Sequence, residues 1–317
     1  MAKSIVFMFS GQGSQYYGMG RELYDYHAVF RKWMDELDLT FRELTGKSVI
    51  ARLYDRAKSP KEPFDTLLYT HAAIFMTEYA LAQVLIDRGI RPDYVLGSSM
   101  GEFASGATAG VIGAEDALRC LVEQVKALDR SCEPGGMLAI LHDPGLYKEW
   151  HMLQEQTELA SVNFHSHFVV SARPEALERI QRELAGKGIA FQRLPVPHAF
   201  HSSLIEPAAA ACRDYLRTIP IRDPLTGYVS CLTGSVLTRI PPSYYWDVVR
   251  APIDFRSALD SLPEGSRYHY VDLGPSGTLA AFAKYNRDPR NPPESSTIMT
   301  PYGNESKRLD ALYEALA

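Results

Sequence analysis

A glycine–serine–glycine turn at residues 97–101 is the feature that most constrains what this chain can fold into. Apolar residues 94–96 lead into Gly97, and a stretch of small residues, 103–110, follows Gly101. The pattern Gly97-x-Ser99-x-Gly101 is typical of a nucleophile elbow, in which a strand ends, the chain turns sharply and a helix begins. We expect the turn to expose the Ser99 hydroxyl beside N–H groups that can stabilise an oxyanion. Because ordinary turns of small residues share this pattern, the turn alone does not make Ser99 catalytic.

Strands and helices alternate on both sides of this turn. This alternation predicts an α/β fold with a mostly parallel sheet, in which ligands bind at the carboxyl ends of the strands. The Gly/Ser-rich turns at 10–15, 97–102 and 274–277 all follow strands, so we expect them to share that edge. The predicted strands are 5–9, 94–96, 227–230 and 268–273, and the predicted helices are about 21–46, 69–88, 115–128, 205–217 and 255–262.

A different pattern begins after residues 134–136. It predicts a β-α-β-β-α-β unit of the ferredoxin-like kind. Its strands are expected at 137–141, 158–163, 168–171 and 191–196, and its helices at 144–154 and 174–187. We therefore divide the chain into a large α/β domain, residues 1–132 and 201–317, and an inserted ferredoxin-like subdomain, residues 133–200.

Composition excludes several classes of function. The chain of 317 residues has a net charge of −5, which argues against a nucleic-acid partner. No apolar stretch approaches the roughly 18 residues of a membrane-spanning helix. The 4 cysteines are scattered without a C-x-x-C pair, which indicates reduced thiols in a cytoplasmic protein and argues against a zinc site.

A serine nucleophile needs a histidine base, and the chain has 9 histidines. His201 is the preferred candidate because it lies in a turn of small and apolar residues where the chain returns from the subdomain. His198 is its rival. His165 and His167 flank a turn between two predicted strands and are expected at the surface, whereas His71 lies in a helix that is apolar almost all round.

Taken together, four motifs resemble the malonyl-CoA:acyl-carrier-protein transacylase family, the acyltransferases of fatty-acid and polyketide synthesis. The motifs lie at 11–15, 97–102, 198–202 and 274–277, and the resemblance covers nearly the whole chain. It implies an α/β-hydrolase-like large domain with a ferredoxin-like subdomain and an active site in the cleft between them. It implies no cofactor, because such enzymes act on thioesters of phosphopantetheine or coenzyme A.

The resemblance also implies roles for individual residues. Ser99 would be the acylated nucleophile and His201 the base. A backbone carbonyl near Val248 would orient the histidine in place of an acidic residue. The N–H groups of Gln12 and Met100 would form the oxyanion hole.

The sequence departs from the family at the acyl pocket, where we expect Gln124, Asn163, Phe200, His71 and Ser98. Malonyl-transferring members have an arginine where this chain has Gln124, and a glutamine cannot neutralise a substrate carboxylate. Malonyl is therefore expected to be a poor substrate, although the string 198–201 is the form usual in malonyl-specific enzymes. Ser98 replaces a usual histidine and His71 a usual glutamine.

Loss of this arginine resembles the freestanding acyl hydrolases of trans-acyltransferase polyketide pathways. Our first hypothesis is a proofreading hydrolase that removes short uncharged acyl groups from acyl carrier protein. The second is a trans-acting acyltransferase that moves an uncharged acyl group between carrier proteins or from acyl-CoA. The third is a non-catalytic carrier-protein-binding module, which would not need the intact motifs. We expect a cytoplasmic monomer.

Overall fold

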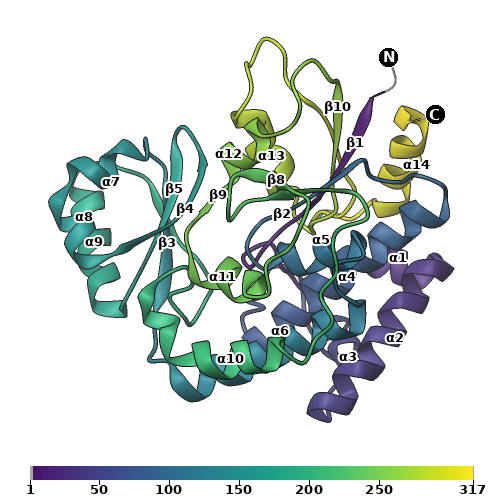
Figure 1. The fold of residues 1–317 in the computed structure, drawn as a ribbon, viewed down its shortest axis with the longest axis horizontal. Helices are drawn as coiled ribbons and strands as arrows, with labels where there is room; N and C mark the ends of the chain where they lie inside the picture. Colours follow the sequence, from purple (N-terminus) through teal and green to yellow (C-terminus); the bar gives the residue numbers. More distant parts are fainter. Residues whose placement is uncertain (1–2, 317) are drawn as a thin grey trace.

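The computed structural model describes residues 3–316 and contains two β-sheets, one in each of two lobes (Figure 1). The larger sheet has the strand order β11-β10-β1-β2-β7-β8, and all its neighbouring strands are parallel except β7 and β8. This confirms the α/β fold that the alternation predicts. The strands are β1 (Ser4–Phe9), β2 (Tyr94–Gly97), β7 (Gly227–Ser230), β8 (Ser235–Leu237), β10 (Tyr268–Asp272) and β11 (Glu294–Thr297).

Helices cover both faces of the larger sheet because its strands are apolar on both sides. Along β1, Phe7 and Phe9 pack into one core with α2, α4, α5 and α6, while Val6 and Met8 pack into another with α12 and α13. The helices of this lobe are α1 (Arg21–Tyr26), α2 (Ala28–Thr45), α3 (Val49–Leu53), α4 (Leu67–Asp87), α5 (Gly101–Thr108), α6 (Ala114–Ser131), the 3₁₀ helix η1 (Ser203–Ala208), α10 (Ala209–Leu216), α11 (Tyr244–Arg250), α12 (Phe255–Asp260), α13 (Thr278–Tyr285) and α14 (Glu305–Leu316).

The smaller lobe is ferredoxin-like. Its antiparallel strands follow the order β6-β3-β5-β4, and α8 and α9 pack on one face of them over a separate apolar core. The opposite face carries Met137, Ala139 and Val169 toward the large lobe. The elements are β3 (Gly136–Ile140), α7 (Gly145–Glu149), α8 (His151–Gln156), β4 (Glu158–Phe164), β5 (His167–Ala172), α9 (Pro174–Gly186) and β6 (Phe191–Arg193).

A fifth strand joins the smaller sheet from outside its own stretch of chain. This strand, β9 (Ile253–Asp254), pairs in parallel with Ser161 and Val162 of β4. Strand β6 is shorter than predicted, because Pro195 has no N–H group for a ladder hydrogen bond. The two lobes therefore share a sheet edge.

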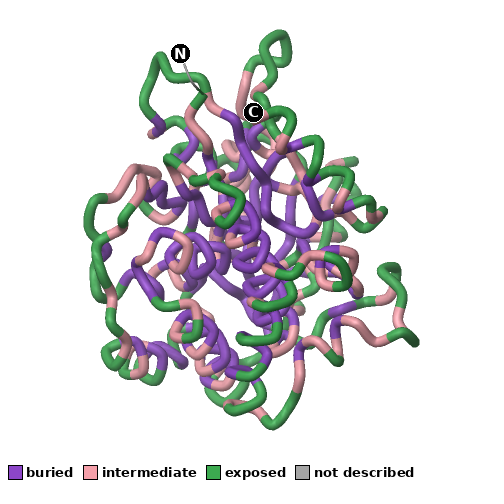
Figure 2. Tube along the Cα trace, turned by 90° about the vertical axis from the view of Figure 1, so that its right-hand side faces the viewer, coloured by how far each residue is buried: buried purple, intermediate pink, exposed green. Residues whose placement is uncertain are grey.

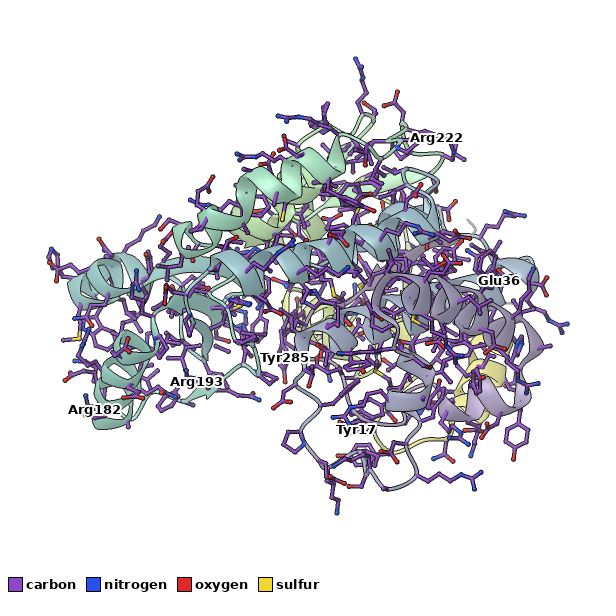
Figure 3. All side chains as sticks on the ribbon, turned by 90° about the horizontal axis from the view of Figure 1, so that it is seen from below. Tyr17, Glu36, Arg182, Arg193, Arg222 and Tyr285 are labelled. Carbon is purple, nitrogen blue, oxygen red and sulfur yellow. The ribbon has the colours of Figure 1, made fainter. Side chains whose placement is uncertain are left out.

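Burial follows these two lobes. In Figure 2 the buried backbone runs through the middle of the molecule and the exposed backbone forms the outer loops. Charged side chains such as Glu36, Arg182, Arg193 and Arg222 lie at the periphery (Figure 3). Across residues 3–316, no helix has both the length and the apolar character needed to cross a membrane.

Candidate active site

The elbow at Ser99 lies between the end of β2 and the start of α5. Ser99 has a φ of 55°, a left-handed backbone conformation that non-glycine residues adopt rarely and at a cost of about 1–3 kcal/mol. Its glycine neighbours permit this geometry: a Cβ atom added at Gly97 would lie 2.5 Å from Glu102 Cα, and one added at Gly101 would collide with the Phe9 carbonyl group. The close packing at these glycines therefore maintains the strained turn, which places the hydroxyl at the carboxyl end of the parallel sheet.

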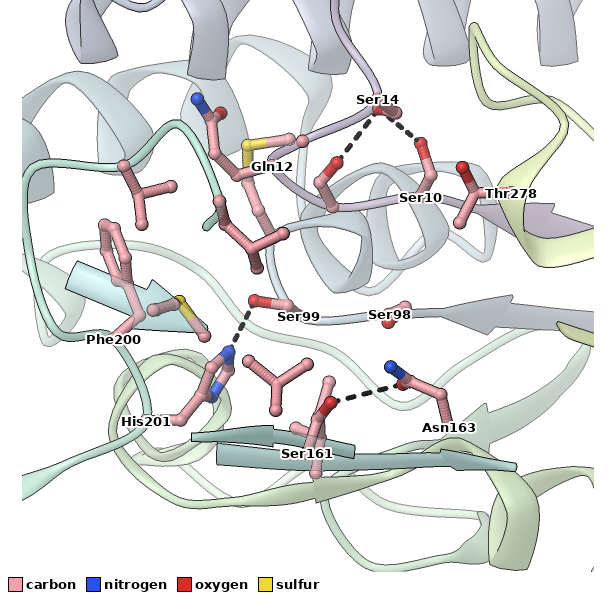
Figure 4. Close-up of a pocket in the computed structure, with 18 of the residues that line it drawn as sticks. Ser10, Gln12, Ser14, Ser98, Ser99, Ser161, Asn163, Phe200, His201 and Thr278 are labelled. Atoms are coloured by element: carbon pink, nitrogen blue, oxygen red, sulfur yellow. Dashed lines mark hydrogen bonds between the residues drawn. The ribbon is translucent and has the colours of Figure 1, made fainter. Parts of the chain in front are cut away.

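His201 faces Ser99 from the turn that leads into η1 (Figure 4). Its Nε2 lies 2.8 Å from Ser99 Oγ, and its Nδ1 lies 2.9 Å from the carbonyl oxygen of Ala251. A carbonyl can only accept, so Nδ1 carries the proton and Nε2 is free to accept the Ser99 proton. His201 also has a left-handed φ, 59°, which its N–H helps to hold by donating to the Val249 carbonyl group at 2.9 Å.

The predicted orienting carbonyl near Val248 is wrong, since the structure assigns that contact to Ala251. Val248 lies inside α11, whose carbonyl groups point along the helix axis. Ala251 follows the helix in an extended conformation, with φ −90° and ψ 156°, so its carbonyl group can turn toward the imidazole. The resemblance to the family had placed this carbonyl three residues too early, inside α11 rather than just after its end.

Burial sets the charge of the base. It lowers the pKa of His201 to about 4, while the hydrogen bond to Ala251 partly opposes this shift. The imidazole is therefore neutral near pH 7, which is the form that can take a proton from serine.

The turn that carries Gln12 packs directly against the elbow. A Cβ atom on Gly11 would lie 2.8 Å from the Ser98 carbonyl oxygen and 3.3 Å from Ser99 Cβ, so only glycine allows this approach. Within residues 3–316, neither the Gln12 nor the Met100 N–H group has a backbone acceptor. Both donors are thus available beside Ser99, as an oxyanion hole requires.

Glu78, which the sequence reasoning missed, supports this turn from α4. Its Oε1 lies 2.7 Å from both the N and the Oγ of Ser10, and Ser14 Oγ lies 2.9 Å from Ser10 Oγ and donates to the Gly11 carbonyl at 2.9 Å. Burial raises the pKa of Glu78 well above its ordinary value. A glutamate in the middle of a mostly apolar helix was the signal that could have identified it.

A second buried carboxyl group lies behind the elbow. Glu102 Oε2 accepts from the Tyr228 hydroxyl at 2.7 Å, and its Oε1 accepts from the Cys231 N–H at 3.1 Å. Burial raises the pKa of Glu102 to about 8. It ties the first turn of α5 to the end of β7 and does not line the cavity at Ser99.

A cavity of about 290 Å³ surrounds the Ser99–His201 pair. Its walls come from the elbow, the Gln12 turn, α4 and α6 on one side and from the small sheet on the other. All the residues predicted at the acyl pocket line it: Gln124, Asn163, Phe200, His71 and Ser98. His198 does not line it, and its Nε2 instead lies 3.0 Å from Asp129 Oδ1.

The described lining of this cavity contains no lysine, arginine, aspartate or glutamate. Its histidines are held toward the neutral form, because burial lowers the pKa of His167 and lowers that of His71 to about 3. Asn163 gives the small-sheet wall a polar surface. Its Oδ1 lies 3.2 Å from Ser161 Oγ (Figure 4), and its Nδ2 lies 2.9 Å from His167 Nδ1. Among residues 3–316, no group of three or more potential ligands is arranged for a metal ion.

An elbow serine on an α/β sheet, with a neutral histidine and two free N–H groups beside it, has the geometry of the serine enzymes that work through an acyl intermediate. The chain belongs to the acyl transferase domain family, whose model matches residues 6–308. It is therefore an enzyme of the acyltransferase family.

Relatives of nearly equal length match it from end to end. It is 46% identical over 316 residues to the polyketide biosynthesis acyltransferase homolog BaeD of Bacillus velezensis, covering 100% of this chain and 98% of that protein. It is 45% identical to the homolog PksD of Bacillus subtilis, with 98% and 96% covered. These relatives support an acyltransferase function in polyketide synthesis.

Solved structures agree with this fold. The acyltransferase domain from the second module of the salinomycin polyketide synthase superposes with a TM-score of 0.86 at 32% identity, covering 99% of this chain and 73% of that one. The malonyl CoA-acyl carrier protein transacylase of Clostridium perfringens shares the fold, with a TM-score of 0.81 at 24% identity and 98% of each chain covered. The predicted combination of a large α/β domain and a ferredoxin-like subdomain is confirmed.

Proposed function

We propose that this enzyme removes short uncharged acyl groups from acyl carrier protein by hydrolysis through an acyl-Ser99 intermediate. One observation carries the proposal: among residues 3–316, no lysine, arginine, aspartate or glutamate lines the cavity around Ser99 and His201, and its histidines are held toward the neutral form. The proposal thus rests on the uncharged acyl groups that this cavity can accommodate as much as on the chemistry of the Ser99–His201 pair.

In the first half of the reaction, Ser99 Oγ attacks the thioester carbonyl carbon and its proton moves to His201 Nε2. The N–H groups of Gln12 and Met100 donate to the oxyanion. When the tetrahedral intermediate collapses, the carbon–sulfur bond breaks and His201 returns the proton to the leaving thiolate. The products of this half are acyl-Ser99 and the free thiol of the carrier.

In the second half, water takes the place of the thiol. His201 Nε2 accepts a proton from the water as its oxygen attacks the ester carbonyl, and it then returns that proton to Ser99 Oγ. Free acid leaves and Ser99 is restored. The amides of Gln124 and Asn163 supply hydrogen-bonding groups within the same cavity for such a water.

The neutral lining disfavours a substrate with a free carboxylate. A carboxylate in this cavity would lose its hydration without gaining a cation, and unpaired burial of a charge is costly. Gln124 stands where a guanidinium would be required, and it can offer only a neutral hydrogen bond. An acetyl or similar acyl group has no such cost.

The carrier protein is proposed as the partner because the two relatives matched from end to end are described as polyketide biosynthesis acyltransferase homologs. Acyl-CoA would present the same phosphopantetheine thioester. In this proposal the enzyme acts beside a polyketide assembly line rather than supplying its extender units.

A second candidate function is transfer of an uncharged acyl group to another carrier thiol. The family membership favours it, and it uses the same acyl-Ser99 intermediate. A carrier-binding module without activity would have no use for the 2.8 Å contact between Ser99 and His201.

Hydrolysis and transfer differ in one measurable product. The enzyme is incubated with isotopically labelled acetyl carrier protein, with and without a saturating second holo carrier protein. We expect most of the label in free acetate in both reactions, measured by mass spectrometry. Label that collects on the second carrier would make the enzyme a transferase. A variant with Ser99 replaced by alanine gives the background rate.

A further inference from the structure

A second, much smaller cavity lies behind the wall of the acyl cavity. Its volume is about 10 Å³, close to that of a single water position. It lies among α5, α6, α10 and α11, and its lining residues are Phe103, Cys120, Glu123, Gln124, Cys212, Tyr215, Leu216, Tyr245 and Trp246.

Of the described residues, Gln124 alone lines both cavities. It lies one helical turn after Cys120 on α6, so the two side chains share one face of that helix. Cys120 lines the small cavity but not the acyl cavity, whereas Gln124 lines both. The Gln124 side chain therefore forms the partition between the two spaces.

Two residues that line the second cavity carry deeply buried polar groups. Tyr245 and Trp246 are only 2% and 1% exposed, yet the Tyr245 hydroxyl and the Trp246 Nε1 have no hydrogen-bond partner in the part of the chain that the structure describes. Buried tyrosine and tryptophan side chains usually find partners for these atoms. The other buried walls, Phe103, Cys120 and Cys212, are apolar or weakly polar.

We propose that Gln124 determines acyl chain length by ending the acyl cavity, and that the space behind it is the extension that a longer uncharged chain would occupy. This inference rests on the proposed acyl cavity. It concerns how far a chain reaches from Ser99, and it is independent of whether water or a thiol later releases the acyl group.

The test follows acylation of Ser99 rather than turnover. Carrier proteins loaded with straight-chain acyl groups from acetyl to octanoyl are mixed with enzyme, and the rate of acyl-Ser99 formation is measured by rapid quench and intact mass. The proteins compared are the wild type, Gln124→Ala, Gln124→Ala with Cys212→Phe, and Cys212→Phe alone. The added phenylalanine enlarges the α10 side chain that borders the second cavity, and it takes up the room that Gln124→Ala opens there.

We expect Gln124→Ala to raise the ratio of octanoyl to acetyl acylation rates about 10-fold or more, because each newly buried methylene contributes about 0.8 kcal/mol. The double variant should return this ratio to within about threefold of the wild type. Asn163→Ala serves as a matched control, since it shortens an amide on the opposite wall that does not border the second cavity. The ratio of octanoyl to acetyl acylation rates in Asn163→Ala should not change when Cys212→Phe is added.

Two results would overturn the inference. One is a folded Gln124→Ala enzyme whose chain-length ratio matches that of the wild type. The other is a double variant that keeps the full shift, because the extra room would then lie elsewhere. If Cys212→Phe does not fold, Leu216→Phe fills the same cavity from the same helix. Failure of the hydrolase proposal would leave these ratios unchanged and would appear only as label transferred to a second carrier.

Discussion

Replacing Glu78 tests whether the oxyanion turn depends on a carboxyl group outside the cavity. In Glu78→Ala, the Ser10 N–H loses the acceptor that lies 2.7 Å from its nitrogen, whereas the Ser10 hydroxyl can still donate to Ser14 Oγ at 2.9 Å. Leaving a buried polar group unsatisfied costs about 1–3 kcal/mol, and this is the destabilisation expected from the Ser10 N–H. For a chain of this size, the unfolding entropy of about 2.1 cal/mol/K per residue means that each kcal/mol lowers the melting temperature by about 1.5 °C.

The same substitution should slow the reaction, because the turn positions the Gln12 N–H. Loss of one oxyanion donor costs about 10²–10³ in kcat. Since its raised pKa favours the neutral acid, Glu78→Gln is expected to retain the acceptor and keep kcat within about threefold of the wild type. The assay is kcat with acetyl carrier protein for both variants, with the melting temperature measured in parallel.

Stability against pH gives an independent measurement on the same residue. A carboxyl group whose pKa is raised in the folded state contributes most at low pH, and this contribution is lost as pH rises above the unfolded value of about 4.5. In Glu78→Gln, the free energy of unfolding should therefore decline less steeply as the pH rises above about 4.5. The reasoning is refuted if Glu78→Gln is as slow as Glu78→Ala, or if Glu78→Ala keeps the wild-type kcat.

Four further outcomes follow from the site. Ser99→Ala should abolish acyl-enzyme in intact-mass spectra and leave turnover orders of magnitude lower; substantial residual acylation would contradict its role as nucleophile. His201→Ala should cut kcat strongly while the circular dichroism spectrum is retained, and His198→Ala should lower kcat far less. A larger loss of kcat in His198→Ala would mean that the base has been assigned to the wrong histidine. Because the pKa of His201 is lowered to about 4, the acid limb of kcat/KM for acylation should have its midpoint below pH 6.5. The free energy of unfolding should decline as the pH falls from about 6.5 toward 4. A kinetic midpoint at pH 6.5 would mean that the imidazole is solvated. Gln124→Arg should raise the rate of malonyl relative to acetyl carrier protein, and an unchanged ratio in the folded variant would show that other residues exclude malonyl.

Sequence reasoning predicted the parts of this protein that depend on strong local patterns. Gly97 and Gly101 predicted the turn that holds Ser99, because only glycine fits where strand and helix approach so closely. The strand at 227–230 coincides with β7, and the long apolar helix was placed to within two residues at its start. The spacing of apolar residues and the residue types at the turns were sufficient to predict these elements.

Elements without a local signal were not predicted. The two residues of β9 have no periodicity, and the end of α11 is marked only by a proline two residues later, so the carbonyl of Ala251 was misplaced. Glu78 was missed because its partner Ser10 lies 68 residues away in the chain. Such contacts depend on the tertiary fold and are not encoded in the spacing of neighbouring residues.

The pairing of β9 with β4 limits how this protein can be recombined. Ala251, whose carbonyl group holds His201, comes two residues before Ile253, which pairs with Ser161 of the small sheet. An exchange of residues 133–200 between relatives would replace one side of this pairing and leave the other in the recipient. A chimera would therefore retain a correctly aligned His201 only if the donor β4 pairs with the recipient β9 in the same register. When subdomains are exchanged, the edge of β4 is thus the part of the donor sequence that must match the recipient.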